Sequence, residues 1–167
     1  MTQALIFVVF PFCLAVAACS DLFTMTIPNR VSAILLGAFL LAAPLCGLGL
    51  TEIGLHLAAG LLVFSIGFVL FALNIMGGGD VKVLSASAVW FGFNISLFEY
   101  ITYVSFFGGL LTLGILLLRA KSELIYASGL PVPAHLLAGR KVPYGIAIGA
   151  AAFAAYPSSP LMLAALG

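Results

Sequence analysis

Charge is the property that this sequence has least of. Only 7% of its 167 residues are charged, whereas 64% are hydrophobic. The net charge of +1 argues against a nucleic-acid partner, because phosphate binding requires a dense basic face. A soluble globular domain is excluded too, because so few polar side chains cannot cover a water-exposed surface. The composition therefore predicts an integral membrane protein whose main surroundings are the lipid bilayer.

Potential metal ligands are also scarce. Cys13, Cys19 and Cys46 lie inside or at the ends of apolar runs, and no two of them form a Cys-x-x-Cys pair. We interpret them as small buried hydrophobic residues rather than as a zinc site or disulfide framework. His56 has no second ligand at helical spacing, so it is predicted to be a polar anchor at a membrane interface. We predict no metal and no cofactor.

Long apolar runs are what the chain has in abundance. A helix needs about 20 apolar residues to cross a bilayer, so we predict an all-α bundle of about six transmembrane helices. They are expected at residues 4–20, 28–50, 54–75, 81–98, 100–118 and from 142 onward, in a single domain over residues 1–167. The first run lacks the positive start of a cleaved signal and is interpreted as a retained helix. Pro157 and Pro160 are expected to interrupt the last helix, and Tyr100 and Tyr103 to form an interfacial aromatic belt.

The few charges predict an orientation. With six crossings, the cations fall on one side and Glu52 and Glu99 on the other. The cations are Arg30, Lys82, Arg119, Lys121, Arg140 and Lys141. The positive-inside rule then places the cationic loops in the cytoplasm and both termini outside. Asp21 and Asp80 are expected on the cytoplasmic side.

The stretch from Met76 to Lys82 is a polar hinge between two apolar runs. Its three glycines are expected to permit unusual dihedrals and the close approach of another peptide to Asp80. A carboxylate at the edge of a hydrocarbon layer is costly and indicates function, including proton or ion transport. Alternatively, Asp80 caps a helix and Asp21 marks a helix boundary. The stretch lacks the ending and the preceding strand of a nucleotide-binding loop.

Two carboxylates at one site predict hydrolytic chemistry. Their proton affinities split, so that one is ionised and deprotonates water while the other donates to a carbonyl oxygen. Asp21 and Asp80 are thus candidates for peptide hydrolysis without a metal. The chain contains neither a Gly-x-Ser-x-Gly nor a His-Glu-x-x-His motif, which other hydrolases use. The base is not assigned, because a coupled pair titrates as a unit.

Three segments resemble one protein family. The stretch from Gly77 to Lys82 resembles the Gly-x-Gly-Asp motif of membrane aspartyl proteases, in the version found in type IV prepilin leader peptidases. Asp21 followed by Ile27-Pro28-Asn29 resembles the first-aspartate motif of that family, and Val142-Pro143-Tyr144-Gly145 resembles the start of its last helix. The resemblance covers essentially the whole chain and is closest to the short form that processes pilins of tight-adherence (Flp) systems.

The resemblance implies an aspartic endopeptidase of the bacterial cytoplasmic membrane that cuts a prepilin after a glycine. The implied catalytic residues are Asp21 and Asp80. The residues implied to shape or support the site are Gly77, Gly78, Gly79, Asn29, Lys82, Pro143 and Gly145. Phe23 stands where short members often have arginine, and the segment between Asp21 and Arg30 has no room for the methyltransferase insertion of longer members. Lys82 is equally interpretable as a solvated cation that sets topology.

Other classes of function stay open at this point. A proton-coupled transporter would hold two membrane-edge aspartates, but internal repeats and midplane polar residues are not found. A non-catalytic assembly subunit of a secretion system would need no glycine hinge. A presenilin-like protease pairs its motif with Tyr-Asp, which Ser20-Asp21 does not match.

Overall fold

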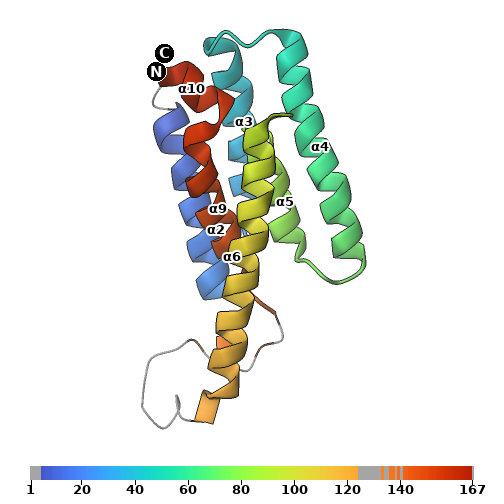
Figure 1. Cartoon of the computed structure of the whole chain (residues 1–167), viewed down its shortest axis with the longest axis vertical. Coiled ribbons are helices and arrows are strands. Elements are labelled where there is room, and N and C mark those ends of the chain that lie inside the picture. The colour runs from blue at the N-terminus through green and yellow to red at the C-terminus, as the bar shows by residue number, and fades with distance from the viewer. Residues whose placement is uncertain (1–4, 124–132, 134–135, 138, 140, 167) are drawn as a thin grey trace.

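The computed structural model describes residues 5–123, 133, 136–137, 139 and 141–166, and these fold into helices without a strand (Figure 1). The predicted all-α class is confirmed. The α-helices are α2 (Phe10–Thr24), α3 (Asn29–Leu45), α4 (Leu50–Ala72), α5 (Gly78–Ala88), α6 (Ile95–Ala120), α9 (Tyr144–Ala155) and α10 (Pro160–Leu166). A π-helix, η1 (Leu5–Val9), precedes α2, and a 3-10 turn, η2 (Tyr156–Ser158), joins α9 to α10.

The longer helices run alternately in opposite directions through one bundle (Figure 1). Helix α9 packs against both α2 and α6, and α5 packs against both α3 and α4. We call the end that holds the connections 25–28 and 73–77 the aspartate end. The opposite, terminal end holds the connections 46–49 and 89–94 together with α10 (Figure 1).

Three helical stretches are long and apolar enough to cross a membrane. They are Ile6–Thr24, Leu50–Ala72 and Ile95–Ala120, and α9 with α10 makes a fourth if this pair, bent by 47°, is one span. Helix α3 is apolar but has 17 residues, and α5 has 11. The six crossings and their orientation therefore stay predictions, although the alternating directions are what six crossings require. The bend confirms the interruption expected at Pro157 and Pro160.

Two predicted boundaries on the N-terminal side are wrong. The first helix continues through Asp21 to Thr24, because the Asp21 carbonyl accepts the Met25 N–H at 2.9 Å and Met25 closes the helix with φ 53°. Asp21 thus lies in the last turn of α2 rather than after the end of the first helix, which was expected at residue 20. Residues 51–53, which were expected to separate two helices, instead belong to the start of α4, because the Glu52 side chain caps this helix by accepting the Gly49 N–H at 2.8 Å.

The helix predicted over residues 81–98 is also wrong. Helix α5 ends at Ala88, and Gly92 turns the chain with φ +62°. Asn94, predicted inside that helix, is instead the N-cap of α6 and accepts the Ile95 N–H at 2.6 Å. An N-cap is the position that asparagine favours.

Several polar residues lie deeper than predicted. Tyr100 is fully buried, hydrogen-bonded to Ser87 at 2.6 Å, so its predicted place in an interfacial belt is wrong. His56 is buried as well and pairs with the Val89 carbonyl in the connection between α5 and α6. Such pairs join helices where no water is present to satisfy polar groups. Cys13 is buried as predicted, whereas Cys19 is exposed; Arg140 lies outside the described residues.

Candidate active site

Asp21 is a buried carboxylate held between two helices. It lies in the last turn of α2 and is only 5% exposed. Its Oδ2 atom accepts a hydrogen bond of 2.7 Å from the backbone N–H of Gly145, in the first turn of α9. Backbone N–H groups and the dipole at a helix N-terminus stabilise an anion. A distant helix thus offsets part of the cost of burying this charge.

Gly145 permits this contact because it has no side chain. A Cβ atom at this position would lie 2.9 Å from Asp21 Cβ and 3.0 Å from Asp21 Oδ2. Pro143, two residues earlier, is the N-cap of α9 and is fully buried. The segment that resembled the start of the family's last helix therefore contacts Asp21 directly.

Asp80 has a related environment at the start of a different helix. It is the third residue of α5 and is 8% exposed. Its carboxylate turns back toward Gly77, whose backbone N–H donates a hydrogen bond to it. A Cβ atom on Gly77 would lie 2.7 Å from Asp80 Oδ2, so only glycine leaves room for this approach. The N-cap of α5 is Gly77, so the alternative that Asp80 caps this helix is wrong.

The other carboxylate oxygen of Asp80 is unsatisfied. Oδ1 is buried and has no hydrogen-bond partner among the described residues. Buried polar atoms in proteins are paired in the large majority of cases, so an orphan requires an explanation. This atom is free to accept a hydrogen bond from water or substrate.

The glycines before Asp80 serve packing rather than unusual backbone conformation. Gly77 has an ordinary extended conformation (φ −73°, ψ 143°), and Gly78 and Gly79 are helical, so the predicted unusual dihedrals are wrong. A Cβ atom on Gly78 would lie 3.2 Å from Phe71, and one on Gly79 would lie 3.3 Å from Ile27 Cβ. The missing side chains therefore let the connection after α2 lie against the start of α5.

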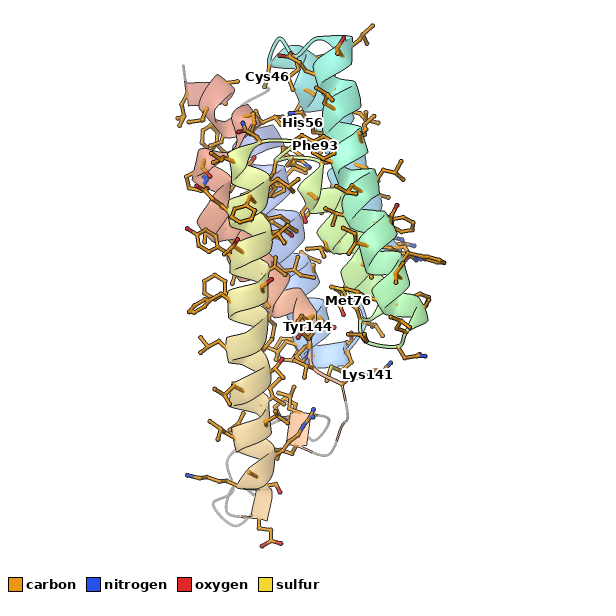
Figure 2. All side chains as sticks on the ribbon, turned by 45° about the vertical axis from the view of Figure 1, so that its right-hand side comes forward. Cys46, His56, Met76, Phe93, Lys141 and Tyr144 are labelled. Atoms are coloured by element: carbon orange, nitrogen blue, oxygen red, sulfur yellow. The ribbon has the colours of Figure 1, made fainter. Side chains whose placement is uncertain are left out.

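The two aspartates line one cavity of about 500 Å³ at the aspartate end. The predicted site residues Asn29, Gly77, Gly78 and Gly79 also line it. Figure 2 shows Met76, Tyr144 and Lys141, which contribute to the same cavity, at this end of the bundle. The fold thus brings together two motifs that are far apart in the sequence.

Of the two lysines near the site, Lys141 lines the aspartate cavity and Lys82 does not. Lys82, predicted as a supporting residue, does not line the cavity and instead donates to Asn29 Oδ1 at 2.8 Å in an exposed contact between α5 and α3. Lys141 lines the cavity and was missed as a site residue. Its position directly before the Val142–Gly145 segment was the signal in the sequence. Phe23, where short relatives often have arginine, is 66% exposed and lies outside the cavity lining.

The surroundings of Asp80 shift its protonation. Burial, together with the nearby negative charge of Asp21, raises the pKa of Asp80 to about 7, although the Gly77 N–H and Lys141 oppose the shift. Asp80 lies in the first turn of α5, at the aspartate end and so at the edge of the crossing that this helix would make, and it therefore exchanges its proton near neutral pH. Such a pKa suits a general acid or base.

No group of three or more histidine, cysteine or acidic residues in the described part of the chain could hold a metal ion.

Comparison with known proteins points to one family. The sequence model of the type IV leader peptidase family matches residues 8–118, which include Asp21, Asp80 and the three glycines before Asp80. No curated protein and no solved structure matches the chain. The segment that holds Gly145 against Asp21 lies beyond the matched range. Its contact with Asp21 comes from the structure alone.

Proposed function

This chain belongs to the type IV leader peptidase family, and we propose that it is an aspartic endopeptidase whose catalytic pair is Asp21 and Asp80. Family membership makes it a membrane peptidase with a prepilin as its substrate. The observation that supports the pair most strongly is their shared cavity, in which each carboxylate contacts the N–H of a glycine and Asp80 Oδ1 has no described partner.

The proposed reaction uses one water and one proton shared by the two carboxylates. The ionised aspartate removes a proton from water as the water oxygen bonds to the scissile carbonyl carbon, and the protonated aspartate donates its proton to the carbonyl oxygen. As the gem-diol intermediate collapses, the C–N bond breaks and the leaving nitrogen receives the proton that the base took. One hydroxyl of the diol returns its proton to the other aspartate, so the product acid forms and the pair again holds one proton. The pKa of about 7 for Asp80 fits a group that holds a proton in one step and gives it up in another.

The proposed substrate is a prepilin of the Flp type, cut after a glycine between its leader and its hydrophobic segment. The connection between α2 and α3 has only four residues, 25–28, which leaves no space for an inserted methyltransferase domain. We therefore propose a single peptidase domain. The three glycines line the same cavity as both carboxylates, so we propose that the substrate backbone passes along this segment.

The proposed topology has six crossings, with the aspartate end in the cytoplasm. Among the described residues, Arg30, Lys82, Arg119, Lys121 and Lys141 lie in or next to the connections of the aspartate end. Glu52 and Glu99 lie near the connections of the terminal end. The positive-inside rule then orients the bundle in the cytoplasmic membrane.

Co-expression with a tagged Flp-type prepilin tests the proposal. The wild type is expected to remove the leader, as read by mass spectrometry of the pilin N-terminus, whereas Asp21→Asn and Asp80→Asn are expected to remove none. Glu52→Gln is the matched control, because it neutralises a carboxylate at the terminal end and keeps an oxygen for the Gly49 N–H. A fully active aspartate variant would disprove the pair. A folded wild type that leaves prepilins uncut would favour a proton-coupled transporter instead.

A further inference from the structure

A second, larger cavity adjoins the aspartate cavity. It has a volume of about 970 Å³ and lies between α4 and α6, with Leu84 of α5 also lining it. We call it the α4–α6 groove. Ile75, Met76 and Tyr144 line both the groove and the aspartate cavity, so the two spaces meet there. Figure 2 shows Met76 and Tyr144 near the aspartate end and Phe93, which also lines the groove, toward the terminal end.

The walls of the groove suit an apolar helix. On α4 they include Leu62, Ile66 and Leu70, spaced four residues apart and therefore on one helical face. No charged residue of the described part of the chain lines the groove. Two of its polar side chains have partners within the bundle: Asn94 Oδ1 accepts the Ile95 N–H, and Ser105 donates to the Ile101 carbonyl. The lining therefore offers contact with hydrocarbon and few free polar groups.

The dimensions of the groove match a helical segment better than a single side chain. Along α6 it extends from Ile95 to Ser105, a rise of about 15 Å at about 1.5 Å per residue. This length accommodates about three turns of a second helix. The volume is at the upper end of the range of about 300–1,000 Å³ for ligand sites.

We propose that the α4–α6 groove binds the apolar segment of the prepilin that directly follows the cleavage site. This inference rests on the proposed function, because it uses the aspartate cavity as the place of cleavage. A peptide bond positioned at Asp21 and Asp80 must continue into a neighbouring space on its hydrophobic side. The groove is a large apolar space that shares Ile75, Met76 and Tyr144 with that cavity. Binding of the apolar segment there positions the cut relative to the membrane.

Two adjacent leucines of α4 provide a matched test. Leu62 lines the groove, whereas Leu61 does not, and both are substantially exposed, at 48% and 64%. A tryptophan at either position therefore extends from the helix surface without entering the core. Leu62→Trp fills the groove and is expected to raise KM for full-length prepilin about tenfold, equivalent to about 1.4 kcal/mol of lost binding. Leu61→Trp is expected to leave KM unchanged.

A short soluble substrate separates groove binding from catalysis. The peptide would contain the leader, the cleavage site and only the first few residues after it. If the groove binds the apolar segment, Leu62→Trp cleaves this peptide at the wild-type rate. Equal KM values for Leu61→Trp and Leu62→Trp with full-length prepilin would overturn the proposal while leaving the peptidase function intact.

Photo-crosslinking tests occupancy without requiring cleavage. A benzophenone side chain at position 62 is expected to crosslink to the apolar segment of added prepilin, whereas one at position 61 is expected to crosslink only to lipid. Crosslinking to prepilin without any cleavage would support binding of the apolar segment in the groove, and it would disprove the proposed peptidase function. Crosslinking only to lipid at both positions would show that acyl chains occupy the groove, and would overturn the inference.

Discussion

A buried titratable side chain lies at each end of helix α5, and the two side chains differ in their hydrogen bonding. At its N-terminal end, Asp80 lies in the first turn, and its Oδ1 atom has no hydrogen-bond partner among the described residues. Just after its C-terminal end, the Val89 carbonyl pairs with His56 Nδ1 at 2.7 Å, and the His56 ring stacks on Phe39. Figure 2 shows His56 at the end of the bundle opposite Met76, Tyr144 and Lys141.

This difference separates structural from chemical use of a buried polar group. His56 uses its Nδ1 atom to join α4 to the end of α5, and Gly92 lies so close that a Cβ there would be 2.6 Å from the His56 Nε2 atom. Asp80 instead retains an acceptor oxygen beside a cavity that it shares with a second carboxylate. A paired buried atom stabilises the fold, whereas an unpaired one lowers stability and is available for a reaction.

The largest expected effect tests the cost of burying Asp80. Because the pKa of about 7 in the folded protein exceeds the ordinary aspartate value of 3.8, the native state holds this proton more tightly than the unfolded state. Stability therefore falls as pH rises from about 4 to about 7, and above that the charge costs about 4 kcal/mol. Asp80→Asn removes this cost and is expected to raise the apparent Tm in detergent by about 10 °C at pH 8.

The pH dependence distinguishes this effect from general stabilisation. The gain is expected to shrink steadily as pH is lowered from 7 to 4, because folding then protonates Asp80 and the free-energy cost of that protonation falls as pH approaches the unfolded-state pKa. A gain of the same size at pH 4 and pH 8 would contradict the raised pKa.

Gly145→Ala is expected to disrupt the aspartate end without affecting the terminal end. The added Cβ would lie 2.9 Å from Asp21 Cβ, so the carboxylate must move away from its hydrogen-bond donor. A displacement of about 1 Å in a catalytic group costs about 100-fold in rate, and leader removal should fall by that factor. The measurement is the initial rate of cleavage of a purified prepilin in detergent.

Gly149→Ala, on the same helix, is the control for this substitution. A Cβ there would lie 3.4 Å from Ala18 Cβ, which is close to ordinary contact, so its rate should remain near that of the wild type. Equal rates for the two variants would show that the Gly145 contact does not position Asp21.

His56→Ala, at the terminal end, is expected to affect stability rather than catalysis. It leaves the Val89 carbonyl without its partner and is expected to lower the free energy of unfolding by about 2 kcal/mol. The cleavage rate per folded molecule should be unchanged, because His56 lies outside the aspartate cavity. A loss of rate without a loss of stability would contradict the structural role that we assign to this histidine.

The aspartate end and the terminal end also show which features an apolar sequence of this kind predicts. Asp21, Asp80 and the glycines were identifiable because charged and flexible residues are rare in an apolar chain, and rarity makes each one informative. The all-helical class followed from the same composition. The contact between Gly145 and Asp21 was suggested by resemblance, but its geometry required the fold.

The errors have a common physical cause. In a membrane protein the core and the lipid-facing surface are both apolar, so the hydrophobic pattern does not show which face of a helix is buried. Tyr100 was therefore assigned to an interface although it is fully buried against Phe91. The starts of α4 and α6 were misplaced because they depend on capping by Glu52 and Asn94, which hydrophobicity does not report.

The smallest expected effect concerns Lys141, the lysine of the aspartate cavity. Its positive charge favours the ionised form of Asp80 and so lowers the pKa of that carboxyl. Lys141→Gln removes this stabilisation, and the limb of the pH–rate profile that reports Asp80 should move to higher pH. The shift should be small, because Lys141 is exposed and solvent screens its charge. Lys121→Gln, which removes a cation outside the cavity lining, should leave the profile unchanged. A shift to lower pH would mean that Lys141 acts on a group other than Asp80.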